Sequence, residues 1–136
     1  MKDSDIQRIR HISTYCRDIA ATLRRFGVEY EIFANDRDYQ NSVSMSIMQI
    51  GELSVGLSDE FKNETRNKIQ WSLIRGMRNM FAHAYISMNK EDIWDTAVND
   101  IPVLLKFCEE TIQVAHEDAA RKDSHGDKPK NHNERE

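Results

Sequence analysis

The stretch that decides the fold class is SDIQRIRHISTYCRDIAATLRRF, residues 4–26. Its apolar side chains recur at steps of three and four residues, which places them on one face of an α-helix. They are Ile6, Ile9, Cys16, Ile19, Ala20, Leu23 and Phe26. We expect Ser4 to cap the start of this helix and Gly27 to end it. The stretch therefore predicts a long amphipathic helix.

The same periodicity returns further along the chain. After a connector over residues 28–36, a second helix is expected over 38–57, with Asp36 and Asp38 at its start. Its serines, with Gly51 and Gly56, are small enough to let another helix approach closely. We therefore predict that this helix carries the most crowded packing surface, either within one chain or within a dimer.

The second half of the chain predicts more helix. Ser58 should cap a short helical turn, and a third helix should begin near Gln70. A last helix, capped by Asn89, should run from about residue 90 to 116 or beyond. Pro102 lies inside it, so it should remove one backbone hydrogen bond and kink the helix.

These segments predict an all-α protein, a four-to-five-helix up-down bundle. We assign residues 1–118 to this bundle. Residues 119–136 form a polar tail, which should be disordered because it lacks large apolar side chains. His125 and His132 of the tail have no cysteine or third spaced histidine beside them, so no metal site is expected there.

The composition agrees with this fold and indicates in which cellular compartment the protein is expected. The chain has 136 residues, 39% of them hydrophobic and 31% charged, with five Gly and two Pro. Cys16 and Cys108 lie in apolar helical stripes, so they should be reduced core thiols. Residues 1–10 lack the apolar core of a signal peptide, and no apolar run is long enough to cross a membrane. We expect a cytoplasmic protein.

The formal net charge of −4 argues weakly against a nucleic-acid ligand. The charge is distributed unevenly, however. Residues 61–88 carry five basic side chains against one acid, whereas residues 89–120 carry two lysines against eight acids. Positive charge is thus concentrated in the segment that also holds the candidate site.

That site lies in RGMRNMFAHAY, residues 75–85, which holds Arg75, Arg78, Asn79, His83 and Tyr85. Histidine can take or give a proton near neutral pH, as cleavage of RNA at its 2′-hydroxyl requires. Arginine can bind a phosphate through two hydrogen bonds and stabilise the charge that develops on it. These residue types suit RNA cleavage without a metal or other cofactor, and DNA would resist because it lacks the 2′-hydroxyl.

Spacing alone leaves the question open. Arg78 and His83 lie about 140° apart on an ideal helix, so they converge only through the reach of arginine, a helix end or a second chain. The alternative is structural, with Arg78 paired to an acid on the last helix and His83 capping its own helix. Trp71 and Trp94 are expected as core anchors, and His11 and His116 as surface residues.

With its context, the segment resembles a known family. Arg78-Asn79-x-x-x-His83-x-Tyr85 is similar to the Arg-x4-His-x-Tyr signature of HepT-like toxins in the HEPN superfamily. IGELSVGLSDEFK (50–62), Trp71 and IWDTAVNDIPVL (93–104) fall in the order and spacing of that family. The similarity covers roughly residues 5–115. Ala84, Gln70 and Met80 depart from common family residues without removing a catalytic group.

The resemblance implies a helical homodimer whose Arg78 and His83 line a cleft between protomers. It implies an endoribonuclease toxin of a type VII toxin–antitoxin system. Its antitoxin would be an MntA-like nucleotidyltransferase, which silences the toxin by transferring AMP from ATP to Tyr85. Asn79 and Arg75 would have supporting roles, and the substrate would be RNA such as tRNA or mRNA, with no role for DNA or a membrane.

Two other functions remain open at this stage. The bundle could be a binding module that docks a nucleotidyltransferase and holds nucleotide or RNA without cutting it. The acidic net charge and the lack of a strong base other than His83 favour that reading modestly. A purely structural dimer is the third possibility.

Overall fold

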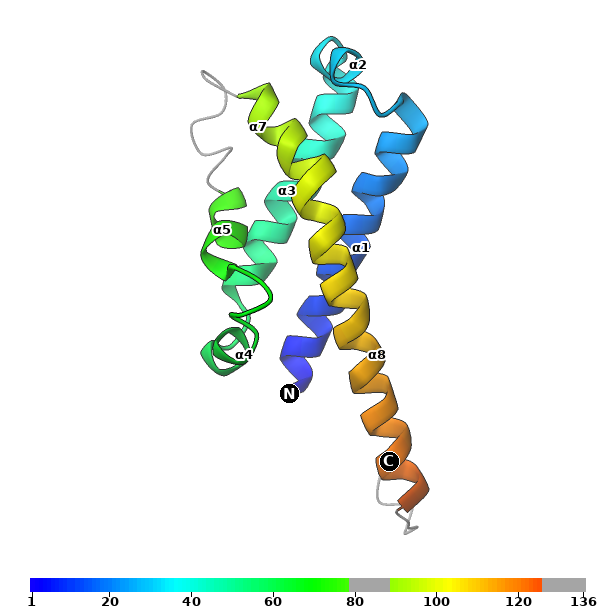
Figure 1. Ribbon diagram of the computed structural model, residues 1–136, viewed down its shortest axis with the longest axis vertical. Helices are drawn as coiled ribbons and strands as arrows, with labels where there is room; N and C mark the ends of the chain where they lie inside the picture. The colour runs from blue at the N-terminus through cyan, green and yellow to red at the C-terminus, as the bar shows by residue number, and fades with distance from the viewer. Residues whose placement is uncertain (79–88, 126–136) are drawn as a thin grey trace.

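The computed structural model describes residues 1–78 and 89–125, which contain helices and no strand (Figure 1). The helices, in chain order, are α1 (Asp3–Phe26), α2 (Tyr30–Ala34), α3 (Arg37–Val55), α4 (Asp59–Glu64), α5 (Trp71–Gly76), α7 (Lys90–Asp95), the π-helical η2 (Thr96–Asp100) and α8 (Ile101–His125). The predicted all-α class is confirmed. None of these helices is long and apolar enough to cross a membrane.

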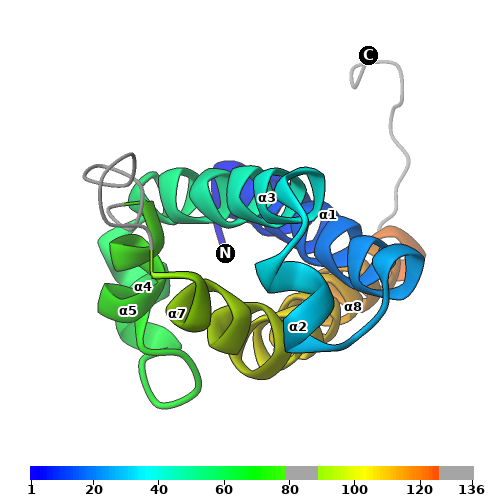
Figure 2. The same ribbon diagram turned by 90° about the horizontal axis from the view of Figure 1, so that it is seen from above.

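Three long helices form the body of the bundle. α1 packs along both α3 and α8 and runs opposite to them, as the colours in Figure 1 show. Its predicted stripe supplies fully buried side chains at Ile9, Cys16 and Ile19, and Ile12, which the prediction left out, is fully buried beside them. α4 and α5 lie together at one side of this body, visible at the left of Figure 2. The periodicity of the apolar residues therefore identified the buried face of α1 without naming every member of it.

Several predicted helix ends are confirmed. Gly27 ends α1 with φ 111°, a conformation that favours glycine, and its N–H donates to the Leu23 carbonyl. Asp36, Ser58 and Asn89 each accept a backbone N–H at the start of α3, α4 and α7. These ends depend on neighbouring residues alone, which explains why the sequence predicts them.

Other local predictions differ from the structure. Ser4 lies inside α1 and Lys2 occupies the N-cap position, without a side-chain cap. The connector over residues 28–36 contains the short helix α2, because Phe33 is drawn fully into the core beside Tyr39 and Trp94. The formation of α2 does not follow from local sequence, since Phe33 packs against Trp94 from a distant part of the chain.

The last predicted helix is not a continuous α-helix. A π-helical turn, Thr96–Asp100, separates α7 from α8 and comes just before Pro102. Pro102 has no N–H to donate to the preceding turn, so the predicted disturbance takes the form of this wider turn. α8 continues to His125, into the stretch expected to be tail from residue 119. Residues 126–136 lie outside the described residues.

Both cysteines are free and buried, as predicted. Burial raises the pKa of both thiols, that of Cys108 to about 12. Each thiol is therefore protonated and unreactive at neutral pH. They serve as small core residues between α1 and α8.

Asp5 provides an anchor that the sequence did not reveal. It is 1% exposed, and its carboxylate accepts hydrogen bonds from the Ser58 N–H at 2.8 Å and the Ser58 hydroxyl at 2.6 Å. Ser58 in turn caps α4 by accepting from the Phe61 N–H. The first turn of α1 is thereby tied to the start of α4.

Replacing Asp5 by alanine should lower the free energy of unfolding by about 1–3 kcal/mol, because the Ser58 N–H loses its buried acceptor. Urea unfolding of Asp5→Ala beside Asp3→Ala measures this. Asp3 is exposed in the same turn, so its replacement should cost only a few tenths of a kcal/mol. Equal losses in the two variants would show that the anchor does not contribute.

Candidate functional site

The structure describes part of the predicted site. Arg75 belongs to α5, and Arg78 follows two residues after this helix ends. Asn79, His83 and Tyr85 lie outside the described residues. The described part of the site is therefore its arginine half, Arg75 and Arg78.

α5 is held in place by aromatic packing. Trp71 at its start is 7% exposed, and its indole N–H donates to the Thr65 hydroxyl at 2.8 Å. The Trp71 ring packs edge-on against Phe107 of α8, with ring centroids 5.7 Å apart, and lies 6.0 Å from Phe61. This confirms Trp71 as a core anchor. Trp94 is partly buried against Tyr30, Phe33 and Tyr39, as expected.

The backbone of Arg78 lies directly against α3 at Gly51. A Cβ built on Gly51 would lie 2.5 Å from the Arg78 backbone nitrogen and 2.9 Å from the Arg78 Cβ. Real side chains do not tolerate such distances, so only glycine allows this approach. The close packing predicted for this helix is thus confirmed, and the segment that fills it belongs to the same chain.

The residue before Arg78 is also held in place, by burial of its side chain in the core. Met77 keeps helical dihedral angles and is 3% exposed, so the residue before Arg78 is fixed in the core. Arg78 is therefore held on one side by Gly51 of α3 and on the other by the burial of Met77. This fixes where its side chain leaves the backbone.

Among the residues that the structure describes, the Arg78 guanidinium pairs with one acid, Glu52. Its Nη1 lies 4.0 Å from Oε2 of Glu52, with side-chain exposures of 38% and 58%. The structural alternative had placed the acid on the last helix, but it belongs to α3. An exposed pair at this distance is worth well under about 1 kcal/mol, so an incoming anion can displace it.

A second feature of Arg78 is its buried Nε. This atom is shielded from solvent and has no hydrogen-bond partner among the described residues. Leaving a buried charged donor without an acceptor costs stability. Because Nε is shielded, an incoming oxyanion would meet the terminal nitrogens of this partly exposed side chain instead. Arginine binds phosphate or carboxylate oxygens through such donors.

The residues around Arg78 set its electrostatic surroundings. Arg75 is exposed and forms no ion pair within residues 1–78 and 89–125, which fits a supporting electrostatic role. Lys62 on α4 and the exposed Arg66 and Lys68 add to the positive charge of this side of the bundle. His11 and His116 are exposed, as predicted.

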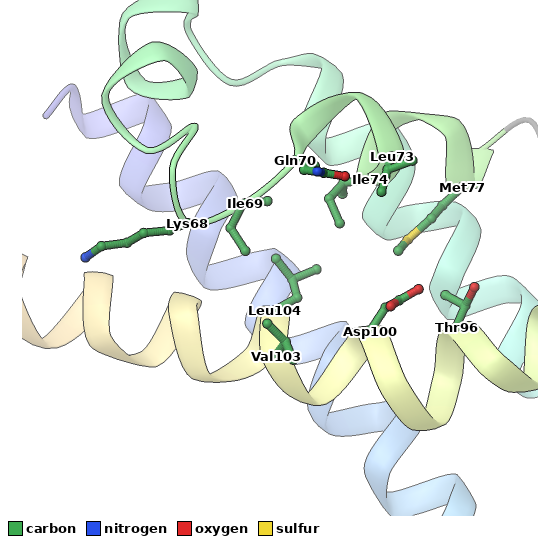
Figure 3. A pocket seen from close by; sticks show the side chains of 10 residues that line it. All are labelled: Lys68, Ile69, Gln70, Leu73, Ile74, Met77, Thr96, Asp100, Val103 and Leu104. Carbon is green, nitrogen blue, oxygen red and sulfur yellow. The ribbon is translucent and has the colours of Figure 1, made fainter.

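A pocket of about 310 Å³ lies behind the site, between α5 and the η2–α8 segment (Figure 3). Ile74 of α5 and Met77, just after that helix, extend into it, and Thr96, Asp100 and Leu104 face them across the gap. Among the described residues that line it, Lys68 and Asp100 alone are charged, and none is a histidine or a cysteine. The described lining therefore adds no second histidine to the predicted site.

Sequence reasoning missed two contributors to this site. Gly51 was recognised as a point of close approach, but nothing in the sequence said that Arg78 would occupy it. Glu52 was overlooked, although an acid beside a glycine in a helix interior was a possible signal. Within the described parts of the chain, no group of His, Cys, Asp and Glu has the arrangement of a metal site.

Comparisons with known proteins place this arrangement in context. Residues 12–111 match a family model described as ribonuclease HepT-like. A protein of Caldanaerobacter subterraneus named "Putative RNase TTE0752" is 31% identical over 105 residues, which are 77% of this chain and 91% of that protein. A protein of Thermococcus cleftensis named "Probable ribonuclease HepT" is 32% identical over 75 residues, 55% of this chain and 67% of the relative. No solved structure gives a significant match.

The close approach of the Arg78 backbone to Gly51, which we call a glycine seat, can be tested with two matched variants. Gly51→Ala should lower the free energy of unfolding by about 1–3 kcal/mol, because the added methyl group meets backbone atoms that cannot move aside. Gly76→Ala, two residues before Arg78, meets nothing within 4 Å. It should leave stability unchanged or raise it by up to about 1 kcal/mol through helix propensity. Urea unfolding distinguishes them, and a neutral Gly51→Ala would contradict the seat.

Proposed function

This chain belongs to the HepT-like ribonuclease family, and from that premise we propose that it is a metal-independent endoribonuclease using Arg78 and His83. The observation that carries the proposal is Arg78, whose backbone is fixed at Gly51 and whose partly exposed guanidinium has one weak acidic partner among the described residues. An arginine held in this way is suited to a phosphate oxyanion. Its substrate would be cytoplasmic RNA.

The proposed reaction is internal transesterification. The 2′-oxygen attacks the adjacent phosphorus as a histidine takes its proton, and the bond to the 5′-oxygen breaks as that oxygen gains a proton. The products are a 2′,3′-cyclic phosphate and a free 5′-hydroxyl. Arg78 would bind the non-bridging oxygens and stabilise the charge that accumulates on them.

One histidine cannot be base and acid in the same step. A homodimer with its cleft between two copies of the motif would supply a His83 from each protomer, one as base and one as acid. It would also bring Arg78 and His83 to a shared phosphate despite their different directions on one helix. Asn79 would orient His83, and Arg75 would add positive potential.

We further propose that the protein is the toxin of a type VII toxin–antitoxin system. An MntA-like nucleotidyltransferase would transfer AMP to the Tyr85 hydroxyl, with pyrophosphate leaving from ATP. Tyr85 lies seven residues from Arg78 in the sequence, so an adenylate there could reach the arginine site. Its phosphate would occupy Arg78 and repel RNA.

A binding module is the second candidate. The net charge of −4 is unusual for a protein that processes a polyanion, and His83 is the one candidate base in the motif. In that case the same cleft would hold nucleotide or RNA without cutting it. A gel would then show RNA shifted in position and unchanged in length.

The ribonuclease proposal is tested by incubating the protein with end-labelled RNA in EDTA. His83→Ala should lower cleavage by about 10²–10⁴-fold, the usual contribution of a general acid or base. Arg78→Ala should lower it by about 10²–10³-fold through lost charge stabilisation. Arg66→Ala is the control, because it removes an exposed arginine from the same basic side of the bundle. Full cleavage by His83→Ala would refute the assignment.

The silencing proposal is tested by intact mass after incubation with ATP and the partner nucleotidyltransferase. The wild-type chain should gain the mass of at least one adenylate and lose RNA cleavage. Tyr85→Phe should gain none and remain active, since it lacks only the acceptor oxygen. Adenylation of Tyr85→Phe would place the modification on another residue.

A further inference from the structure

α3 carries a second glycine seat, and a second arginine fills it. A Cβ built on Gly56 would lie 2.3 Å from Nε and 2.8 Å from Cζ of Arg8. The Arg8 side chain of α1 thus lies across the C-cap of α3, whereas at Gly51 it is the Arg78 backbone that lies against the helix. Two arginines from distant parts of the chain are therefore held against glycines of α3 and its C-cap, Arg8 by its guanidinium and Arg78 by its backbone.

The geometry of α3 relates the two seats. Gly51 and Gly56 are five residues apart, which is about 7.5 Å along the helix axis and about 140° around it. Within that arc lie Val55 at about 40° and Glu52 at about 100° from Gly51. Val55 is 40% exposed and the Glu52 side chain 58%. An exposed strip of α3 is thus bordered by Arg78 on one side and Arg8 on the other.

Arg8 is not paired with any acid in the described ranges 1–78 and 89–125. Its one hydrogen bond is from Nη1 to the Ser4 carbonyl at 3.4 Å, and it forms no ion pair within the described part of the chain. Arg17, by comparison, is paired with Glu109 at 3.6 Å. Arg8 is also partly buried, so its side chain is more restricted than that of a fully exposed arginine. Most of its donors remain available to a ligand.

We propose that Arg8 is a second RNA-binding arginine, which holds a phosphate within a few nucleotides of the one bound by Arg78. The seats differ by about 7.5 Å along the axis and by about 140° around it, so a strand that contacts both arginines must run obliquely across the strip. An RNA strand crossing the exposed strip of α3 would meet Arg78 at one border and Arg8 at the other. The inference rests on the proposed ribonuclease function. Arg8 touches no reacting atom, so its role is substrate binding.

The test uses an RNA oligonucleotide that carries 2′-O-methyl groups throughout, because it binds without being cut. Its dissociation constant is measured by fluorescence anisotropy over a series of salt concentrations. Arg8→Gln, which retains a donor and most of the side-chain length, should raise Kd by roughly three- to tenfold. The slope of log Kd against log salt should fall by about 0.7, the value for one phosphate contact on a single strand.

Arg24→Ala is the matched control for charge. It removes an exposed arginine from the same helix, about 24 Å from Arg8 along the axis. Its Kd and salt slope should stay close to those of the wild type. If Arg8→Gln and Arg24→Ala weaken binding equally, general positive charge explains the effect and the proposed contact is wrong.

Gly56→Ala tests the seat without removing the charge. The added methyl group must displace the Arg8 guanidinium, whose flexible end can move without disrupting the fold. Binding should weaken towards that of Arg8→Gln, while Gly76→Ala should bind as the wild type does. If Gly56→Ala binds the RNA as tightly as the wild type, the claim that Gly56 positions Arg8 for binding is wrong. Thermal unfolding of each variant confirms that the comparison is between folded proteins.

The outcomes separate this inference from the proposed function. With unmodified RNA, Arg8→Gln should raise KM and leave kcat unchanged. If the protein binds the methylated RNA through Arg8 but does not cut unmodified RNA, the proposed ribonuclease activity is refuted and the proposed Arg8 contact stands. If the protein cuts RNA and Arg8→Gln changes neither Kd nor KM, the ribonuclease activity stands and the Arg8 contact is refuted.

Discussion

The contact between Gly51 and the Arg78 backbone is the constraint on which the candidate site depends. α5 can approach α3 this closely only because α3 presents no side chain at that point. Trp71 and Met77 then fix the same segment from the core side, through packing on Phe107 and Phe61 and through burial. The direction of the Arg78 side chain is therefore set by backbone packing rather than by its own ion pair. This explains why a weak contact with Glu52 is sufficient there.

Features that depend on a few neighbouring residues were predicted well. The helices, the apolar stripe of α1, and the ends at Gly27, Ser58 and Asn89 all follow from spacing or capping chemistry. Features that depend on distant partners were not. α2 forms where Phe33 enters a cluster with Tyr39 and Trp94, and Asp5 is buried because Ser58 donates to it from across the bundle.

The candidate site shows the same division. The motif identified Arg78 by residue type and by resemblance, and Gly51 was recognised as a point of close packing. The sequence could not say that the two meet, since they are distant along the chain and belong to different helices. Glu52 had no local signal beyond its place beside a glycine, and Arg8 had none. Each becomes informative only once α3 is seen as a shared surface for α1 and α5.

A net negative protein can still present positive potential where a polyanion must bind. Electrostatic attraction at close range depends on nearby charges, because salt screens those more than about 8–10 Å away. Within the described residues Arg78 pairs weakly with Glu52, and Arg8 forms no ion pair, so the two arginines that border the exposed strip of α3 are weakly neutralised. The Nε of Arg78 is shielded from solvent, so the terminal nitrogens are the donors that a phosphate would meet. Backbone packing at Gly51 thus fixes the base of this side chain and leaves its end accessible.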